Sequence, residues 1–409
     1  MSAPLSKHEM KLGTPIPEMG EGPISVEPYV SAEFFQQEKQ KIFRQAWIEV
    51  CRDDMIPNPG DYQVCPMEVW DSEIIVVRGK DNQVRAFHNI CPHRGMKVVR
   101  LDHDESQNFQ CGHAQVLICP FHGWGYNLDG TLRPVMGEEY FDKIDRDQVG
   151  LIPVTLDIWN GFVFVHYQQE PAQPLREFLG ELADDMEENP FDSFTHIARY
   201  SAQAKCNWKA SMDAFHEAYH AATLHGGSIP EAARLPEGSV PTSARIYGPH
   251  HSLSMWASPD FRPTPAAIAA WKYGQSFSAG GEMKLPGANP SNDENWWFDI
   301  NVFFPNFFCD TGPGWYFTYN FRPISESETV WVMDIYQKKA ESCSQRIAQE
   351  HTKVMLRDIV YEDLSTLEQT QEMLSSGLLK TLNISSSLEV AVRHLHATAC
   401  EWVASEEKT

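Results

Sequence analysis

Apolar residues recur at three- and four-residue steps in two parts of the chain, a spacing that predicts helices. One stripe lies within residues 207–225 and consists of Trp208, Met212, Phe215, Tyr219 and Ala222. The other follows Ser31, a residue type that caps helices, and continues to about Ala46. We expect two further helices, around residues 357–368 and from Leu388 to Val403.

Short apolar or alternating runs, separated by turns that contain glycine, predict strands in the first half of the chain. The runs are residues 74–78, 83–87, 115–118 and 158–165. Residues 79–82 and 127–130 supply two of the turns. We therefore expect residues 48–166 to form a small antiparallel β domain.

Aromatic side chains dominate three runs in the second half, residues 296–306, 315–321 and 330–336. Their composition predicts antiparallel strands that line an apolar site. Before them, residues 226–292 carry Gly and Pro at close intervals. A long irregular stretch inside a domain is usually a functional lid or a disordered loop, and we expect a lid over the site.

These patterns together predict an α+β fold. Residues 48–166 form the small antiparallel β domain, and residues 167–409 form a larger domain with an antiparallel sheet flanked by helices. Residues 1–47 contribute an arm, rich in Pro, Gly and charge up to residue 28, and a helix that packs on the larger domain.

Composition narrows the classes of partner. The chain has 409 residues with 42% hydrophobic content, which is enough for two or three domains. Its formal charge of -23 argues against nucleic acid or an anionic membrane as a partner and favours a basic protein surface. The first residues contain no apolar signal region, and no window approaches eighteen apolar residues, so we expect a soluble cytoplasmic chain.

Cysteine and histidine occur together in two loop-like motifs of the β domain. The motifs are Cys91-Pro92-His93-Arg94-Gly95 and Cys119-Pro120-Phe121-His122-Gly123-Trp124. Nine cysteines spread over the chain do not suggest a disulfide framework, so clustered ones are better interpreted as metal ligands. Zinc sites usually pair Cys with Cys and His with His, whereas here each loop offers one of each. That mixture suits a Rieske [2Fe–2S] cluster.

Residues 207–225 combine their apolar stripe with two carboxylates and three imidazoles. On one continuous helix Glu217 and His220 would lie one turn apart, whereas His225 would lie about 140° from His220. The two imidazoles therefore converge only if the helix is distorted or ends, and Gly226-Gly227 can end it. Two histidines and a carboxylate from elsewhere would make the facial triad that binds non-haem Fe(II). The alternative is a polar helix with satisfied core histidines.

The two Cys–His loops, followed by Glu217-Ala218-Tyr219-His220 and His225, resemble the catalytic α subunit of the Rieske non-haem iron ring-hydroxylating oxygenases. The resemblance covers residues 30 to 400. It implies that Cys91, His93, Cys119 and His122 hold the cluster and that His220, His225 and a later aspartate hold mononuclear iron. It also implies that Glu217 bridges to a cluster histidine of the neighbouring subunit.

Within the helix at 357–368, position in the family pattern favours Asp363 as the aspartate. Glu362 is adjacent but points about 100° away on a helix, and Asp358 and Glu368 lie more than one turn off. A solvated helix face is the alternative for any one of them.

Three features depart from the family pattern. The interval between His93 and Cys119 contains 25 residues, 94 to 118, with an apparent insertion at 104–114. Cys111 and His113 lie there and are rival ligands to Cys119 and His122. Many relatives have Asp where Glu217 stands. His216 is an extra imidazole, which we interpret as an exposed helix residue.

The resemblance implies an enzyme that uses O2 and NAD(P)H-derived electrons to hydroxylate a small apolar substrate, aromatic or cyclic. No dinucleotide fingerprint follows a strand, so a separate reductase must supply the electrons. The resemblance also implies a homotrimer. The sequence leaves open whether a ferredoxin intervenes, whether a β subunit binds, and whether one oxygen atom or two are inserted. The rival functions are a Rieske electron carrier without catalytic iron and a zinc-binding interaction protein.

Overall fold

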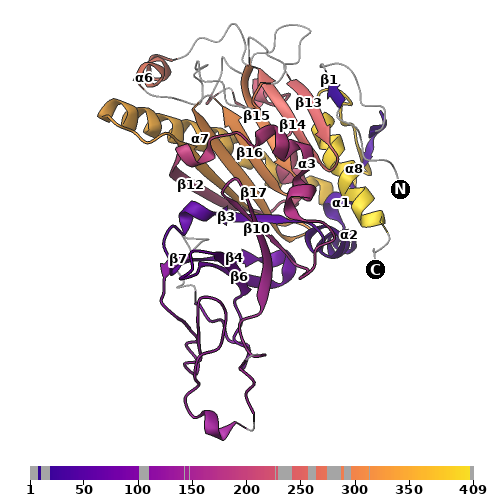
Figure 1. The fold of residues 1–409 in the computed structure, drawn as a ribbon. Coiled ribbons are helices and arrows are strands. Elements are labelled where there is room, and N and C mark those ends of the chain that lie inside the picture. Colours follow the sequence, from indigo (N-terminus) through magenta and orange to yellow (C-terminus); the bar gives the residue numbers. More distant parts are fainter. Residues whose placement is uncertain are drawn as a thin grey trace. The chain divides into compact units, whose positions relative to one another are not determined.

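The computed structural model describes most of the chain. The described residues are 8–10, 19–100, 110–141, 143–146, 148–225, 227–228, 242–256, 264–273, 287–289, 296–312 and 314–405. The chain divides into two compact units (Figure 1). Unit 1 comprises Met1–Ile42 and Leu179–Thr409, and unit 2 comprises Phe43–Phe178. Both units contain antiparallel sheets, and helices are concentrated in unit 1, so the predicted α+β class is confirmed.

Unit 2 is built on a seven-stranded antiparallel sheet with the order β3-β11-β10-β6-β5-β4-β7. Its strands are β3 (Ile48–Arg52), β4 (Asp61–Met67), β5 (Ser72–Arg78), β6 (Val84–His88), β7 (Gln110–His113), β10 (Pro153–Trp159) and β11 (Phe162–His166). A separate two-stranded hairpin pairs β8 (Leu117–Ile118) with β9 (Gly125–Tyr126). Short 3-10 turns occur at Asp53–Met55, Glu68–Trp70 and Glu138–Tyr140.

One predicted strand of unit 2 is wrong. The run 158–165 is the end of β10, a two-residue turn and most of β11. Asn160 and Gly161 form that turn with φ of 47° and 81°. Positive φ at both central residues is the geometry of a type I′ hairpin, for which Asn-Gly is a strong sequence signal. The hairpin could therefore have been predicted.

Unit 1 contains an eight-stranded antiparallel sheet with the order β1-β13-β14-β15-β16-β17-β18-β12. The strands are β1 (His8–Met10), β12 (Thr195–Ala204), β13 (Thr242–Tyr247), β14 (His250–Trp256), β15 (Trp296–Phe303), β16 (Phe307–Gly312), β17 (Trp315–Ser325) and β18 (Glu328–Gln337). The three aromatic runs correspond to β15, β17 and β18. The prediction missed β16, which follows β15 after a three-residue turn.

Most of the described helices lie in unit 1. They are α1 (Glu27–Val30), α2 (Ala32–Glu38), α4 (Trp208–Asp213), α5 (Ala221–Leu224), α6 (Pro265–Tyr273), α7 (Cys343–Ser375) and α8 (Val390–Ala404), with a π-helical segment at Lys39–Phe43 and a 3-10 turn at Phe191–Ser193. The predicted cap is confirmed, because Ser31 Oγ accepts a hydrogen bond from Phe34 N at the start of α2. Helix α3 (Leu175–Met186) contains the boundary between the two units, and a small sheet pairs β2 (Ile24–Ser25) with β19 (Thr381–Leu382).

We call the face of the large sheet that meets α4 and the segment after it the inner face. Phe215 packs on Tyr319 and Phe321 at ring distances of 4.9 and 5.5 Å. The ring of His216 stacks on Phe308 at 5.0 Å. Because side chains alternate along a strand, these contacts define which residues of β16 and β17 point to this face.

A buried ion pair connects α2 to α4. Lys209 Nζ lies 2.6 Å from Glu38 Oε1, and both side chains are fully buried. Trp208 Nε1 donates a hydrogen bond of 3.1 Å to the other oxygen, Glu38 Oε2. The N-terminal helix therefore fixes the start of the segment that carries His220.

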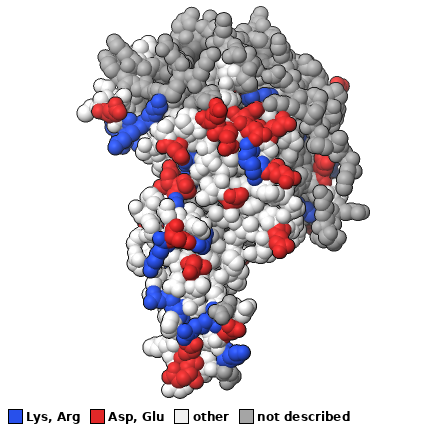
Figure 2. Space-filling model, viewed as in Figure 1, with Lys and Arg blue, Asp and Glu red and all other residues white. Residues whose placement is uncertain are grey.

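Several expectations concern residues outside the described part of the chain. They include most of the N-terminal arm, residues 104–109 of the proposed insertion, and much of the expected lid at 226–292. The described part of 226–292 contains strands β13 and β14 of the large sheet and helix α6, so the expectation of a long irregular stretch is wrong there. Within the described part, no helix combines the length and apolar character needed to cross a membrane. On the face shown in Figure 2, acidic side chains are widely spread, and basic side chains lie among them.

Candidate metal centres

The segment 207–225 is two short helices rather than the single helix that the apolar stripe predicts. Asn207 caps α4 by accepting a hydrogen bond from Lys209 N, and the helix ends at Asp213. Glu217 lies in the break, where its Oε2 accepts hydrogen bonds from the backbone N–H groups of Tyr219 and His220. A side chain that satisfies backbone donors in this way competes with helical hydrogen bonds. The distortion that His220 and His225 need therefore occurs before His220.

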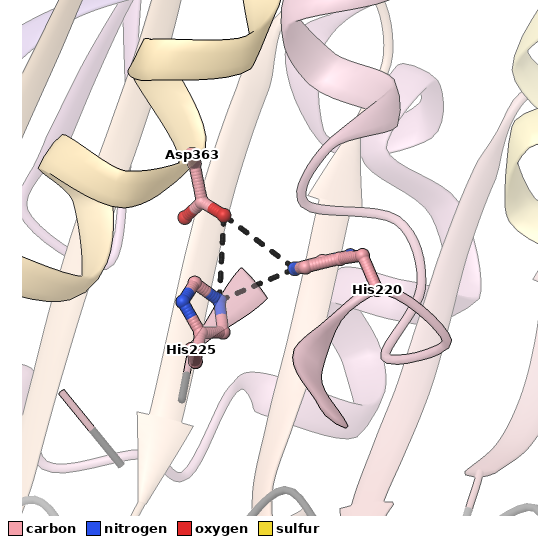
Figure 3. Close-up of side chains that lie close together, drawn as sticks. All are labelled: His220, His225 and Asp363. Atoms are coloured by element: carbon pink, nitrogen blue, oxygen red, sulfur yellow. Dashed lines mark hydrogen bonds and ion pairs between the residues drawn. The ribbon is translucent and has the colours of Figure 1, made fainter. Parts of the chain in front are cut away.

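His220, His225 and Asp363 converge in unit 1 (Figure 3). The two Nε2 atoms are 3.2 Å apart. Asp363 Oδ1 lies 3.5 Å from Nε2 of His220 and 3.3 Å from Nε2 of His225. The histidines come from either end of α5, and the aspartate comes from the middle of α7.

Each histidine is held at its other ring nitrogen by a glutamate. His220 Nδ1 lies 2.5 Å from Glu217 Oε1, and His225 Nδ1 lies 2.9 Å from Glu362 Oε2. Ser228 Oγ donates a 2.6 Å hydrogen bond to the same oxygen of Glu362. Carboxylates at Nδ1 favour the tautomer with the proton there, which leaves the Nε2 lone pairs directed at the common centre.

His220 and Asp363 each shift the pKa of the other. Desolvation opposes the charged form of His220, but its contacts with Asp363 and Glu217 raise the pKa of the imidazole to about 10. Burial raises the pKa of Asp363 above its ordinary value, and the imidazoles of His220 and His225 offset part of that shift.

The three ligand atoms fit a divalent metal ion. Bonds of about 2.1 Å at right angles place neighbouring ligand atoms ~3.0 Å apart, close to the observed separations. Within the described chain, Asp363 Oδ1 is buried and accepts no hydrogen bond. Two neutral imidazoles and one carboxylate are the donor set of non-haem Fe(II) sites with open positions.

In unit 2 the two Cys–His loops have the same backbone turn. Gly95 N donates to Cys91 O, and Gly123 N donates to Cys119 O, at 2.9 and 3.0 Å. Cys91 N donates to Met96 O, and Cys119 N donates to Trp124 O, both at 2.8 Å. Each glycine has positive φ, 76° and 73°, which a residue with a Cβ adopts only with strain.

The side chains of these loops lie together. The rings of His93 and His122 are 4.5 Å apart, and His93 stacks on Trp124 at 4.7 Å. The Cys91 and Cys119 thiols are buried and interact with each other, and burial raises the pKa of Cys91. His93 Nδ1 is buried without a hydrogen-bond partner among the described residues, whereas His122 is exposed. Two thiols and two imidazoles on paired turns fit a Rieske cluster.

Two neighbours of the predicted ligands were missed in the sequence. Glu362 was considered only as a rival to Asp363, although a ligand histidine usually donates its second N–H to a carboxylate, and Glu362 was an available one. Tyr126 lies beside the second motif, and its hydroxyl is 3.0 Å from Cys91 Sγ. Nothing in the spacing of the sequence indicated that contact.

Two interpretations of other residues can be compared with the structure. His216 is not exposed as expected but 1% exposed, because it packs against the inner face. Cys111 and His113 lie on the edge strand β7, where Cys111 is exposed and His113 Nδ1 contacts Asp61 Oδ1 at 2.8 Å. His113 thus binds Asp61 and is not grouped with the cysteine loops.

Comparison with known proteins defines the class first. Residues 46–140 match the model of the Rieske [2Fe-2S] domain, and residues 191–405 match that of the ring hydroxylating alpha subunit (catalytic domain). The protein therefore combines a Rieske domain with the catalytic domain of non-haem iron oxygenases. The chain belongs to the family of ring-hydroxylating alpha subunits.

Individual relatives differ in what they act on. The chain is 30% identical over 201 residues to the carnitine monooxygenase oxygenase subunit of Acinetobacter pittii, an alignment that covers 49% of this chain and 51% of the relative. It is 30% identical over 350 residues to the large oxygenase component of the 2,4-dinitrotoluene dioxygenase system of a Burkholderia species, covering 78% and 72%. The chain thus spans about half the length of the first of these relatives and more of the second.

Solved structures share the fold. Naphthalene 1,2-dioxygenase from a Rhodococcus species, bound to indole, superposes with a TM-score of 0.76 at 18% identity, covering 94% of this chain and 95% of that one.

Proposed function

We propose that this chain is the terminal oxygenase component of a multicomponent Rieske oxygenase, which uses O2 and NAD(P)H-derived electrons to hydroxylate an apolar cyclic substrate. The observation that carries the proposal is the convergence of His220 Nε2, His225 Nε2 and Asp363 Oδ1 within 3.2–3.5 Å. A Rieske electron carrier would not need that second site. A zinc-binding interaction protein would need neither the mixed Cys–His loops nor the triad.

The proposal assigns a role to each candidate residue. Cys91 and Cys119 would hold one iron of the cluster, and His93 and His122 the other. His220, His225 and Asp363 would hold the mononuclear iron. When bound, the cluster supplies one-electron transfer and the non-haem iron supplies activation of dioxygen.

Glu217 and Glu362 are positioning residues in this proposal. By accepting hydrogen bonds from the Nδ1–H groups, they keep both Nε2 lone pairs available and fix the orientation of the rings. Glu217 also has a second role, because we propose that in an oligomer it lies against His122 of the partner subunit and so connects the two metal centres. The exposure of His122 supports this, because the ring is accessible to another chain.

The exposed surface around His122 is suited to binding another protein. Phe121 is 53% exposed and packs on the ring of His122 at 3.8 Å. An exposed aromatic side chain beside a redox centre suits docking by another protein, such as a reductase, a ferredoxin or a further subunit of a homotrimer. The acidic balance of the chain favours a partner with a basic surface.

The aromatic inner face supports an apolar substrate. Phe308, Phe317, Tyr319 and Phe321 pack on one another there, at ring distances of 5.2 to 6.2 Å. The relatives do not select one substrate, because their names include both carnitine and 2,4-dinitrotoluene.

Metal content tests the proposal. The oxygenase should contain about three irons and two sulfides per chain, an electron carrier two irons and two sulfides, and a zinc protein no sulfide. Asp363→Ala should remove about one iron and all hydroxylation while the cluster remains reducible, because the triad loses its anionic ligand. Full activity in that variant would contradict the assignment of Asp363.

A further inference from the structure

An aspartate whose side chain has no hydrogen-bond partner among the described residues lies on the inner face of the large sheet. Asp310 is on β16, two residues after Phe308, and is only 3% exposed. Its Oδ1 is buried and has no hydrogen-bond partner among the described residues. Alternation along the strand places its side chain on the same face as Phe308, whose ring stacks on His216.

The residues paired with Asp310 across the sheet are apolar. Its direct neighbours across the sheet are Ile300 on β15 and Phe317 on β17. Side chains at such paired positions are in contact, with Cβ atoms about 5 Å apart. Burial, together with the charge of Asp299, raises the pKa of Asp310 well above its ordinary value.

Two other buried aspartates in the same sheet provide a contrast. Asp299 accepts hydrogen bonds from Ser254 Oγ and Asn289 N and lies 3.8 Å from Arg245 Nη2. Asp334 is bound by Arg199 and His196 at 2.7 Å each. Burying a carboxylate without a donor or cation is costly, and these two follow the rule. Asp310 departs from it within the described chain.

Tyr319 links the surroundings of Asp310 to the segment before His220, because its ring packs on Phe215 at 4.9 Å. Tyr319 pairs with Phe308 across the two strands. Asp310 pairs with Phe317, which is the next pair along the strands whose side chains point to the same face. The carboxylates of Asp310 and Asp363 both act on the Tyr319 hydroxyl, which burial and these charges hold at a raised pKa.

We propose that Asp310 binds a basic nitrogen of the substrate, while the aromatic side chains beside it contact the apolar part. A carboxylate flanked by aromatic rings is suited to an ammonium group, which gains both a charge partner and cation–π contacts. The inference rests on the oxygenase function proposed above and specifies its substrate class. Asp310 would then serve substrate binding, although an unpaired buried carboxylate lowers the stability of the ligand-free protein.

Binding of three probes of similar size tests this inference on the full chain with its metals in place. The probes are benzylammonium, toluene and benzoate, and dissociation constants are measured by calorimetry. We expect the native protein to bind benzylammonium about 10-fold or more tightly than toluene, the range that a hydrogen bond to a charged group supplies. Asp310→Asn, which keeps the shape and removes the charge, should abolish most of that preference.

Stability of the ligand-free protein gives a second measurement. Asp310→Asn should unfold at the same temperature as the native protein or higher, because it removes an unpaired buried acid. The matched variant Asp334→Asn should unfold at a lower temperature, because Arg199 and His196 lose their partner, and it should keep the preference for benzylammonium. A lower unfolding temperature for Asp310→Asn would show that Asp310 has a structural partner and would overturn the inference.

The binding result can also overturn it. A native protein that binds toluene or benzoate as tightly as benzylammonium, or does not bind benzylammonium, contradicts the assignment, as does an unchanged preference in Asp310→Asn. Iron and sulfide content of the same preparations separates the two proposals. Three irons without a preference for benzylammonium contradict only the role of Asp310, whereas a missing third iron contradicts the oxygenase function.

Discussion

At the scale of single residues, the two nitrogens of each site histidine have different roles. Nε2 of His220 and of His225 faces the common centre, while Nδ1 is held by a carboxylate from the same turn or from α7. The glutamates thus determine which nitrogen is available to a metal ion. Because both contacts are of the same kind, Glu217 and Glu362 form a natural pair for comparison.

Glu217→Gln should keep the cluster, most of the iron and the oligomer but lower turnover about 10- to 100-fold, the usual cost of losing a carboxylate behind a metal ligand. Glu362→Gln is the matched control, since it alters the same contact at His225. If Glu217 also connects the two metal centres, its variant should lose more turnover per bound iron than the Glu362 variant. Glu217→Asp should retain partial activity.

Single-turnover reduction of the mononuclear iron distinguishes these roles. A Glu217→Gln protein in which that iron is reduced at the native rate would limit Glu217 to a structural role.

Tyr126 provides a second prediction at this scale. Its hydroxyl lies within hydrogen-bonding distance of Cys91 Sγ, at 3.0 Å, and its ring is fully buried. Hydrogen bonds to cluster sulfurs stabilise the reduced, more negative state. A net hydrogen bond of about 1 kcal/mol corresponds to ~40 mV for one electron, so Tyr126→Phe should lower the reduction potential by that amount.

Voltammetry or a redox titration of the visible absorbance measures the shift. Tyr140→Phe, at a tyrosine that is 87% exposed, is the control and should leave the potential unchanged. An unchanged potential in Tyr126→Phe would show that the hydroxyl does not donate to the cluster.

At the scale of elements, the connection between α2 and α4 depends on a charge pair without access to water. Lys209→Met leaves Glu38 buried and unpaired, apart from the hydrogen bond from Trp208 Nε1. We expect a loss of about 3–5 kcal/mol in the free energy of unfolding of unit 1. Denaturant titration measures it.

The double variant Glu38→Gln with Lys209→Met should recover much of that loss, because no charge remains buried. A double variant as unstable as Lys209→Met alone would indicate that the packing of the lysine stem, rather than the charge, matters.

The elements also show what the sequence could and could not predict. Ser31 and the aromatic strands were predictable because their signals are local. The apolar stripe through Phe215 and Tyr219 continues at helical spacing, so it concealed the break that Glu217 produces with its own side-chain hydrogen bonds. The turn at Asn160 and Gly161 had a local signal that was overlooked.

The candidate site divides in the same way. His220 and His225 were predicted from the cluster of polar residues and the family pattern, the Cys–His loops from their motif, and Asp363 from the family pattern. The contact of Glu362 with His225, and the lack of a described hydrogen-bond partner for Asp310, depend on residues far apart in the sequence. Only the folded chain shows them.

At the scale of the whole molecule, the two candidate metal centres belong to different units. His220, His225 and Asp363 lie in unit 1, and the Cys–His loops lie in unit 2. Sites without shared partners usually respond independently to substitution. Cys119→Ser should therefore abolish the visible Rieske absorbance and leave about one iron per chain, because a hydroxyl is a poor substitute for a thiolate.

Cys111→Ser is the control for that change, since Cys111 is exposed on β7. We expect it to keep the absorbance. Bleaching by Cys111→Ser, but not by Cys119→Ser, would reverse the ligand assignment.

The paired turns of unit 2 have a consequence for how this protein could evolve. Each turn is closed by hydrogen bonds within six residues, from Cys91 to Met96 and from Cys119 to Trp124. Neither turn needs a particular length of chain between them to keep its shape. Insertions within residues 97–118 that leave β7 and β8 intact would therefore meet little selection against them, provided that both turns still reach each other. The 25-residue interval of this chain can be understood as such a neutral expansion, a change in the length of the linker that left both turns intact.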